Sequence, residues 1–188
     1  MKDFISKYKK DLISLIEVID GDIVSQIKTA IENVFKENSK IYILGNGGSA
    51  ATASHMVNDL GAGLARRDIM YLNIESLSDN SSVCTALAND TGYENIFYMQ
   101  LKNRLKPNDL IIAISCSGNS PNILKAVEYA KGYGVTIIGV TGFDGGKLKQ
   151  LSDINFHVET DYGNYGQVED LHMILDHILY SYFIERKK

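Results

Sequence analysis

The chain has 188 residues, of which 45% are hydrophobic and 22% are charged, a composition typical of one globular domain with a sizeable core. Its 19 basic and 23 acidic residues give a formal net charge of −4, and Lys and Arg form no run longer than three residues, so nucleic acid is not an expected partner. Two cysteines, Cys84 and Cys116, are too few for a disulfide framework, and no apolar stretch suits a signal peptide or a membrane span. These properties predict a cytoplasmic protein without membrane contact.

The first fifth of the chain has the apolar spacing of helices. Apolar residues recur every three or four positions from Phe4 to Ile19 and again from Ile23 to Phe35. The polar segment DGD at 20–22 separates the two patterns. We therefore expect a helical hairpin over residues 1–38.

Strand and helix patterns alternate over the rest of the chain. Continuous apolar runs predict strands, and amphipathic stretches between them predict helices. The predicted strands are 40–44, 69–74, 109–115, 134–141 and 154–159, and the predicted helices are 50–62, 79–88, 93–104, 120–132, 146–151 and 165–185. This alternation implies right-handed crossovers and a parallel sheet covered on both faces. The expected fold class is α/β, a three-layer sandwich with a five-stranded parallel sheet, in one domain whose core is 39–188.

Loops rich in glycine and serine follow three of the predicted strands. They are GNGGS at 45–49, SCSGNS at 115–120 and TGFDGG at 141–146. Ligands of open α/β sheets bind at the carboxyl ends of strands, where hydroxyls beside a helix N-terminus form a cradle for an anion. Ordinary turns and caps are the alternative for any one loop. Two such loops in register across a sheet favour a sugar phosphate.

A dinucleotide is the weaker alternative ligand for the first loop. Residues 45–50 fit the pattern G-x-G-x-x-A, which has a real false-positive rate. The acidic residue that would bind a ribose has only Glu75 as a candidate, and it comes slightly late. The serine-rich second loop is also not something a dinucleotide requires, so an oxidoreductase is disfavoured.

Two pairs of histidine and carboxylate side chains lie on predicted helices. His55 and Asp59 are four residues apart, and Glu169 and His177 are eight apart, so each pair shares a helix face. The four groups are compatible with Zn²⁺ or with proton transfer, and a solvated polar face is the alternative for the first pair. His157 and His172 are expected to be structural. Asp176, next to His177, could orient that imidazole, although adjacent residues of a helix point apart.

These motifs together resemble the sugar isomerase (SIS) domain family. The resemblance is carried by GNGGSA, His55 with Asp59, ANDTGYENIF, ISCSGNSPNILKA, VTGFDGG and QVEDLHMILDHIL, which cover nearly the whole chain. Within the family the chain is most similar to the phosphoheptose isomerases. The resemblance implies a flavodoxin-like fold and interconversion of sedoheptulose 7-phosphate and D-glycero-D-manno-heptose 7-phosphate. It also implies a homotetramer with active sites between subunits and a zinc ion in each subunit.

The resemblance assigns roles to particular residues. Asp59 is the expected base, and His177 is its acid–base partner. The expected zinc ligands are His55, Asp59, Glu169 and His177. The expected sugar- and phosphate-binding residues are Asn46, Gly47, Gly48, Ser49, Asn89, Asp90, Ser115, Cys116, Ser117, Ser120 and Glu169.

Three of these positions depart from the residues usual in the family. Cys116 replaces a threonine, Asp59 replaces a glutamate, and Glu169 replaces a glutamine. Aspartate is one methylene shorter, and a displacement of ~1 Å can lower a rate on the order of a hundredfold. Glu169 adds a negative charge, which favours a bound cation or raises a neighbouring pKa.

Three functions are compatible with the sequence. The leading hypothesis is a ketose–aldose isomerase that uses sedoheptulose 7-phosphate through an enediol intermediate. The second is a sugar-phosphate-binding protein without turnover, either a sensor or a protein that binds the replication initiator. The third is an isomerase of another phosphorylated ketose, which would explain the replaced residues without loss of activity.

Overall fold

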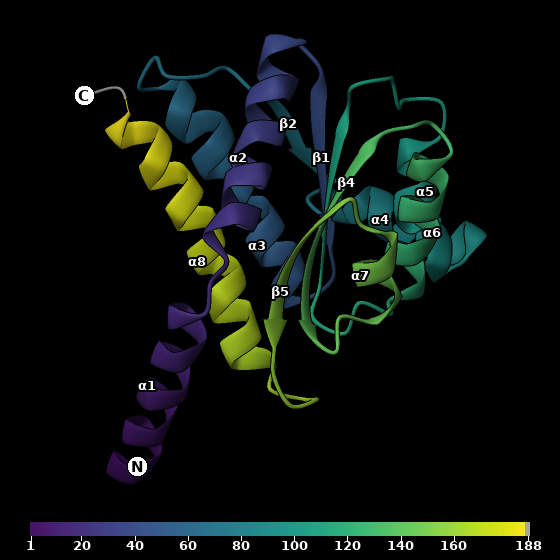
Figure 1. Ribbon diagram of the computed structural model, residues 1–188. Helices are drawn as coiled ribbons and strands as arrows, with labels where there is room; N and C mark the ends of the chain where they lie inside the picture. The colour runs from purple at the N-terminus through teal and green to yellow at the C-terminus, as the bar shows by residue number, and fades with distance from the viewer. Residues whose placement is uncertain (187–188) are drawn as a thin grey trace.

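The computed structural model describes residues 1–186 of the chain (Figure 1). Five parallel strands form one sheet in the order β2-β1-β3-β4-β5. The strands are β1 (Lys40–Gly45), β2 (Asn73–Ser76), β3 (Leu110–Ser115), β4 (Thr136–Phe143) and β5 (Ile154–Glu159). The expected α/β fold with a five-stranded parallel sheet is therefore confirmed.

Helices cover both faces of this sheet (Figure 1). One face packs against α2 (Gly21–Lys36), α3 (Gly48–Met56), η1 (Val57–Gly63) and α8 (Tyr165–Glu185). The other face packs against α4 (Ser81–Thr91), α5 (Ile96–Leu101), α6 (Pro121–Lys131) and α7 (Gly146–Leu151), with the short η2 (Tyr93–Asn95) before α5. Because both faces are covered, the central strands are continuous apolar runs, and every residue of β3 is buried.

Side chains at the helix starts account for several of the boundaries. Asp20 accepts hydrogen bonds from the backbone N–H groups of Asp22 and Ile23, which caps α2. Asn80 accepts from Val83 N at 3.0 Å and caps α4. Pro121 occupies the first position of α6, where its missing N–H costs nothing.

The second predicted strand is shorter than expected. The apolar run began at residue 69, but β2 begins at Asn73, which pairs with Lys40 at the start of β1. Residues 69–72 therefore precede the point at which β1 can offer them a partner. Met70 is nevertheless buried in the core, which accounts for its apolar character.

The helix expected over 50–62 is divided into two parts. α3 ends at Met56, and a π-helix, η1, continues to Gly63. A π-helical turn widens the backbone and is frequent at functional sites. His55 is at the end of α3 and Asp59 is in the first turn of η1.

The first helix, α1 (Lys2–Glu17), extends away from the body of the molecule and does not fold back along α2 as a closed hairpin (Figure 1). Across residues 1–186, none of the buried positions belongs to α1. The Tyr8 hydroxyl donates to Asp170 Oδ2 at 2.5 Å, which ties α1 to the beginning of α8. Within the same described range, we find no helix with the length and apolarity needed to cross a bilayer.

Candidate functional site

A reciprocal amide pair fixes the loop that follows β1. Asn46 Nδ2 donates to Asn122 Oδ1 at 2.9 Å, and Asn122 Nδ2 donates to Asn46 Oδ1 at 2.8 Å. The Tyr93 hydroxyl donates to Asn46 Oδ1 at 2.9 Å. Since Asn122 is in the first turn of α6, these bonds hold the loops after β1 and β3 in one relative position.

These two loops line a pocket of about 160 Å³ at the carboxyl end of the sheet. α3 begins beside it at Gly48 and α6 begins beside it at Pro121, so the positive ends of two helix dipoles lie at the pocket, where they favour an anion. Its lining residues are Asn46, Ser49, Ile114, Ser115, Cys116, Ser117, Ser120, Tyr165 and Glu169. This pocket, the serine pocket, thus contains most of the residues expected to bind a sugar phosphate.

The serine loop, residues 115–120, has a hydrogen-bonded turn at its centre. Ser115 Oγ accepts from Gly118 N at 3.2 Å and lies 3.4 Å from Ser120 Oγ. Gly118 has a φ of 61°, and a Cβ at this position would lie 1.9 Å from the carbonyl oxygen of Gly145. Glycine is therefore required for the third predicted loop, 141–146, to pack against the serine loop.

Cys116 presents a neutral group to the pocket. Burial raises the pKa of its thiol to about 11, and the negative charge of Glu169 acts in the same direction. The thiol is consequently protonated at neutral pH and adds no anion to a site that would bind phosphate.

Gly47 and Gly48 allow a close approach of α3 to α8. Gly47 has a φ of 54°, which favours glycine where the chain turns into the helix. A Cβ on Gly48 would lie 2.3 Å from Glu169 Oε1, so the Glu169 carboxylate rests directly against the first turn of α3.

Asn89 and Asp90 lie outside this pocket. Both are exposed on α4, and Asn89 Nδ2 donates to Asp90 Oδ1 at 2.8 Å. Within one chain they are therefore not assembled with the serine loop, although sequence reasoning grouped them with it.

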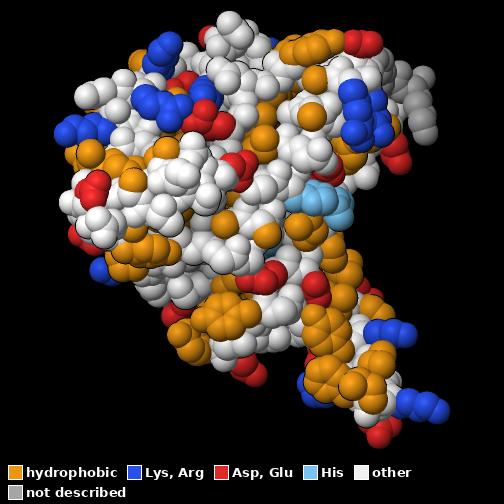
Figure 2. Space-filling view, turned by 180° about the vertical axis from the view of Figure 1, so that it is seen from behind, with side chains coloured by type: hydrophobic (Ala, Val, Ile, Leu, Met, Phe, Trp, Pro, Cys, Tyr) orange, Lys and Arg blue, Asp and Glu red, His pale blue; other side chains and the backbone are white. Residues whose placement is uncertain are grey.

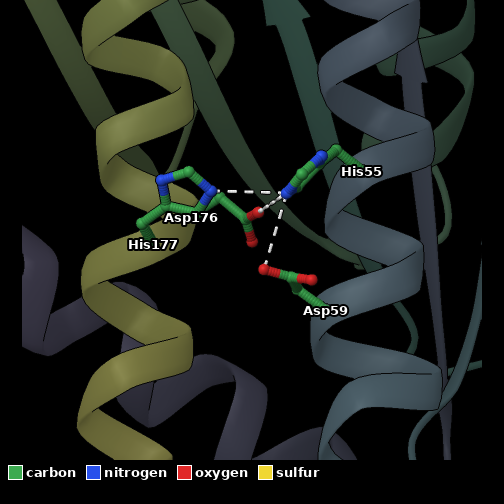
Figure 3. Close-up of side chains that lie close together, drawn as sticks. All are labelled: His55, Asp59, Asp176 and His177. Carbon is green, nitrogen blue, oxygen red and sulfur yellow. Dashed lines mark hydrogen bonds and ion pairs between the residues drawn. The ribbon is translucent and has the colours of Figure 1, made fainter.

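A second cluster lies between the end of α3 and the middle of α8 (Figure 3). His55 Nε2 is 3.3 Å from His177 Nε2, 3.6 Å from Asp59 Oδ2 and 3.9 Å from Asp176 Oδ2. One ligand atom from each of these four residues lies within 4.8 Å of the other three. The two histidines are partly exposed, and histidine side chains are visible on the molecular surface in Figure 2.

The acidic members of this cluster are buried. Asp59 is 7% exposed, and its Oδ1 accepts from Asn58 Nδ2 at 2.8 Å. Asp176 is fully buried, and neither of its carboxylate oxygens accepts a hydrogen bond from any described residue. Burial, reinforced by the negative charge of Asp59, raises the pKa of Asp176 to about 7. The cluster thus offers two nitrogen and two oxygen donors, and one of its carboxylates is buried without a hydrogen bond. Such a donor set fits a divalent cation such as Zn²⁺.

Comparison with known proteins identifies the family. The family model described as SIS domain matches residues 7–142. A phosphoheptose isomerase of Trichlorobacter lovleyi is 36% identical over 182 residues, which cover 95% of this chain and 91% of that protein. One from Helicobacter pylori strain P12 is 40% identical and covers 91% of this chain and 85% of its own. The chain belongs to the SIS domain family.

Solved structures agree with this assignment to the SIS family. The phosphoheptose isomerase of Neisseria gonorrhoeae superposes with a TM-score of 0.86 at 25% identity and covers 98% of both chains. That of Francisella tularensis gives a TM-score of 0.85 at 26% identity over 97% of both chains. The similarity to known proteins thus includes α1, which begins before the matched SIS segment, and α8, which lies wholly after it.

In this structure, Glu169 lies apart from the other three residues that the sequence analysis grouped with it as metal ligands. Glu169 lines the serine pocket, whereas the cluster of His55, Asp59 and His177 contains Asp176 as its fourth member. The structure therefore divides the expected ligand set between two neighbouring sites. The sequence offered one sign of Asp176: a charged residue between the apolar Leu175 and Leu179 on a helix that packs in the core.

His157 and His172 have structural contacts. His172 is 1% exposed, and its Nε2 donates to the carbonyl oxygen of Thr141 at 3.2 Å. Burial lowers its pKa to about 4, so this imidazole is neutral. His157 Nδ1 lies 3.0 Å from Thr141 Oγ1, and burial lowers its pKa as well. The His157 ring therefore links β5 to β4, and the His172 ring links α8 to β4 in the core.

Proposed function

We propose that this protein is an aldose–ketose isomerase that converts sedoheptulose 7-phosphate to D-glycero-D-manno-heptose 7-phosphate through an enediol intermediate. The observation that carries the proposal is the serine pocket beside a buried carboxylate and an imidazole, in a chain that matches phosphoheptose isomerases along nearly its whole length. The reaction needs an anion site and two proton carriers next to each other.

The serine pocket supplies the anion site. Hydroxyls of Ser115, Ser117 and Ser120 donate to the phosphate, and the positive end of the α6 dipole stabilises its charge. Asn46 and Ser49, which line the pocket near the start of α3, bind sugar hydroxyls. Asn89 and Asp90 hold hydroxyls only where a neighbouring chain brings α4 to the site, since within one chain they lie apart from the pocket.

Asp59 and His177 carry the protons. Isomerisation of a 2-ketose requires removal of a proton from C1 and its return to C2, with a second proton moved between O1 and O2. Asp59 acts as the base for the carbon-bound proton, and His177 moves the proton between the oxygens. His55 Nε2 lies 3.6 Å from Asp59 Oδ2 and 3.3 Å from His177 Nε2, so all three groups face one point.

A zinc ion, one per subunit, would be held by His55, Asp59 and His177. The family resemblance implies Glu169 as a fourth ligand. When bound, the cation supplies polarisation of the substrate carbonyl. A carboxylate that binds a cation is a weaker base. Metal binding by Asp59 would therefore reduce its ability to remove the proton. The enzyme acts in the cytoplasm on a soluble sugar phosphate.

The proposed assembly is a homotetramer with active sites between subunits. Its support is the apolar side of α1, where exposed side chains include Phe4, Ile5 and Ile16. Figure 2 shows apolar side chains along this projecting helix. A monomer leaves that surface in water, whereas a neighbouring chain would cover it.

The test is incubation of the purified protein with sedoheptulose 7-phosphate, with and without Zn²⁺, followed by chromatography with mass detection of the heptose 7-phosphate. Wild type should form product, and Asp59→Asn should lower kcat/KM by at least ~100-fold because it removes the base. Asp22→Asn, which removes an exposed charge at the start of α2, serves as the control and should retain activity. Saturable binding of the sugar phosphate without product would contradict the proposal and favour a sensor.

A second candidate is an isomerase of another phosphorylated ketose. It is favoured by one observation, the shorter carboxylate at Asp59, which would suit a substrate seated differently. Product from a ketose of another chain length, with none from sedoheptulose 7-phosphate, would select this candidate.

A further inference from the structure

Asp176 is a buried acidic side chain that the proposed chemistry does not use. It is fully buried on α8, and both of its oxygens lack a hydrogen-bond donor among residues 1–186. A carboxylate buried in this way is costly unless a positive charge or a set of donors compensates it. The nearest ion-pair partner among the described residues is His55 Nε2 at 3.9 Å from Asp176 Oδ2, which is too long for a hydrogen bond. The position therefore calls for a further partner.

The neighbours of Asp176 are ligand atoms. Asp59, from η1, is also buried, while His55 and His177 direct their Nε2 atoms into the same space (Figure 3). Metal binding requires carboxylate anions and uncharged imidazole nitrogens, so a set of two of each would bring two negative charges, which one divalent cation would neutralise. This balance removes the repulsion between Asp59 and Asp176 that otherwise opposes their common burial.

The spacing of these atoms suits a small cation. In a tetrahedral zinc site with bonds of roughly 2.0 Å, ligand atoms lie about 3.3 Å apart. The three separations from His55 Nε2 are 3.3, 3.6 and 3.9 Å. Small rotations of the side chains would bring all four atoms to a common ion.

Glu169 is held at a different level of α8. It precedes Asp176 by seven residues, so the two share a helix face but are roughly 10 Å apart along the axis. On α3, Gly48 precedes His55 by seven residues as well, and Gly48 is the residue that Glu169 touches. The contact between α3 and α8 thus sets Glu169 beside the serine pocket and Asp176 beside His55.

We propose that Asp176, rather than Glu169, is the fourth ligand of the divalent cation, together with His55, Asp59 and His177. The inference deepens the proposed function, on which it rests for the presence of a cation site, and it redefines the ligands of that site. Glu169 then remains in the serine pocket, where its carboxylate is available to the hydroxyls of the sugar.

The first test measures binding of Zn²⁺ alone to the full-length protein after removal of metal with a chelator. Metal per chain is measured by mass spectrometry, and the dissociation constant is measured by competition with a chromogenic chelator. Asp176→Asn should weaken binding at least ~10-fold because it removes a charged ligand. Glu169→Gln and the matched control Asp170→Asn, on the same helix, should stay within about twofold of wild type. Wild-type affinity in Asp176→Asn, or a greater loss in Glu169→Gln, would overturn the proposal.

A second test detects ligation directly. A thiolate bound to Co²⁺ produces a charge-transfer absorption in the near ultraviolet. Asp176→Cys loaded with Co²⁺ should show this band above the wild-type spectrum, and Glu169→Cys should not. The band in Glu169→Cys alone, or in neither variant, would overturn the proposal even if Asp176→Asn were unstable.

Neither test contains sugar, so their outcomes are separable from the isomerase assay. Wild-type protein that binds Zn²⁺ through Asp176 but leaves every ketose phosphate unchanged would contradict the proposed function and support the cation site. Protein that isomerises its substrate while Asp176→Asn binds Zn²⁺ normally would support the function and overturn this inference.

Discussion

Gly118 joins the serine loop to the loop after β4. Its positive φ turns the chain toward the pocket, and its lack of a side chain lets the Gly145 carbonyl approach to a distance that no Cβ would allow. Leu148 N also donates to the Gly118 carbonyl at 2.9 Å, so the contact is bonded as well as close. One residue therefore determines the shape of the proposed phosphate site.

Two glycine-to-alanine variants should separate the free-energy cost of a positive φ from the cost of the steric clash at Gly118. Gly134 has a φ of 68° but no atom within 4 Å of a Cβ, so Gly134→Ala should lower the free energy of unfolding by about 1 kcal/mol. Gly118→Ala has the same backbone penalty plus the clash with Gly145, and we expect a loss of about 2–4 kcal/mol. Urea unfolding checks the difference. Equal losses in the two variants would contradict the tight approach of the two loops.

Gly118→Ala should also affect the proposed ligand. Because the clash must displace the serine loop, affinity for the sugar phosphate should fall at least ~10-fold, measured by titration calorimetry. Gly134→Ala, far from the pocket lining, should bind as wild type does.

His172 should make the protein sensitive to acid. Its pKa is about 4 in the folded protein, below the ordinary value of 6.5, so the unfolded chain binds more protons between these values. Stability from this group is complete above pH 6.5 and is lost as the pH falls toward 4. At about 1.4 kcal/mol per pKa unit, the loss approaches roughly 3 kcal/mol.

Urea unfolding at several pH values between 7.5 and 4 checks this prediction. His172→Gln keeps an N–H donor for the Thr141 carbonyl but has no ionising group. It should be less stable than wild type at pH 7.5 and should lose less stability on acidification. Parallel curves for the two proteins would show that another group causes the acid sensitivity.

At the scale of elements, α1 is a helix whose apolar stripe is only partly buried within one chain. Leu12 and Leu15 pack toward the core, while Phe4, Ile5 and Ile16 are at least 40% exposed. A 16-residue helix with little tertiary packing is marginal in water. The sequence periodicity correctly predicts the helix, but within one chain the apolar side chains of Phe4, Ile5 and Ile16 remain exposed.

Charges on that stripe should dissociate the proposed assembly. Phe4→Asp and Ile5→Asp place carboxylates on exposed apolar positions, so the folded chain is unaffected while a subunit interface is lost. Light scattering after gel filtration should report a smaller mass than for wild type. Lys10→Asp changes the charge more but lies on the opposite side of α1, and it should leave the mass unchanged. A wild-type monomer would contradict the tetramer.

At the scale of the whole molecule, the proposed cation site joins two segments that are far apart in the chain. His55 and Asp59 come from the first α/β crossover, and Asp176 and His177 come from the last helix. A ligand that binds both segments stabilises the folded state, because the unfolded chain does not hold them together.

Zinc should therefore raise the melting temperature. At a free concentration of 100 times the dissociation constant, binding adds about 2.7 kcal/mol. For a chain of this size that corresponds to an increase of about 5–10 °C, measured by differential scanning calorimetry. His55→Ala should abolish the increase, and excess chelator should reverse it in wild type. An unchanged melting temperature at saturating zinc would contradict binding to the folded state.

The order of strands and helices follows from the sequence alone. Buried parallel strands require continuous apolar runs, and β3, α7, β5 and α8 lie within one residue of the predicted ranges. The glycine and serine loops are likewise local features, because strand ends and helix starts determine where they fall. The edges are less well determined, since β2 begins only where β1 can pair with it.

The tertiary structure alone decided which side chains meet between α3 and α8. Glu169 and Asp176, seven residues apart, point the same way from α8, and His177 lies about a quarter-turn from Glu169. Helical periodicity gives these directions but does not say which level of α8 meets α3. The level is set by packing: Gly48 lets α3 approach Glu169, and seven residues later His55 arrives beside Asp176. The sequence by itself therefore determined the fold and the residue types of the candidate site. The packing of two helices decided which carboxylate lies beside the serine pocket and which lies beside His55.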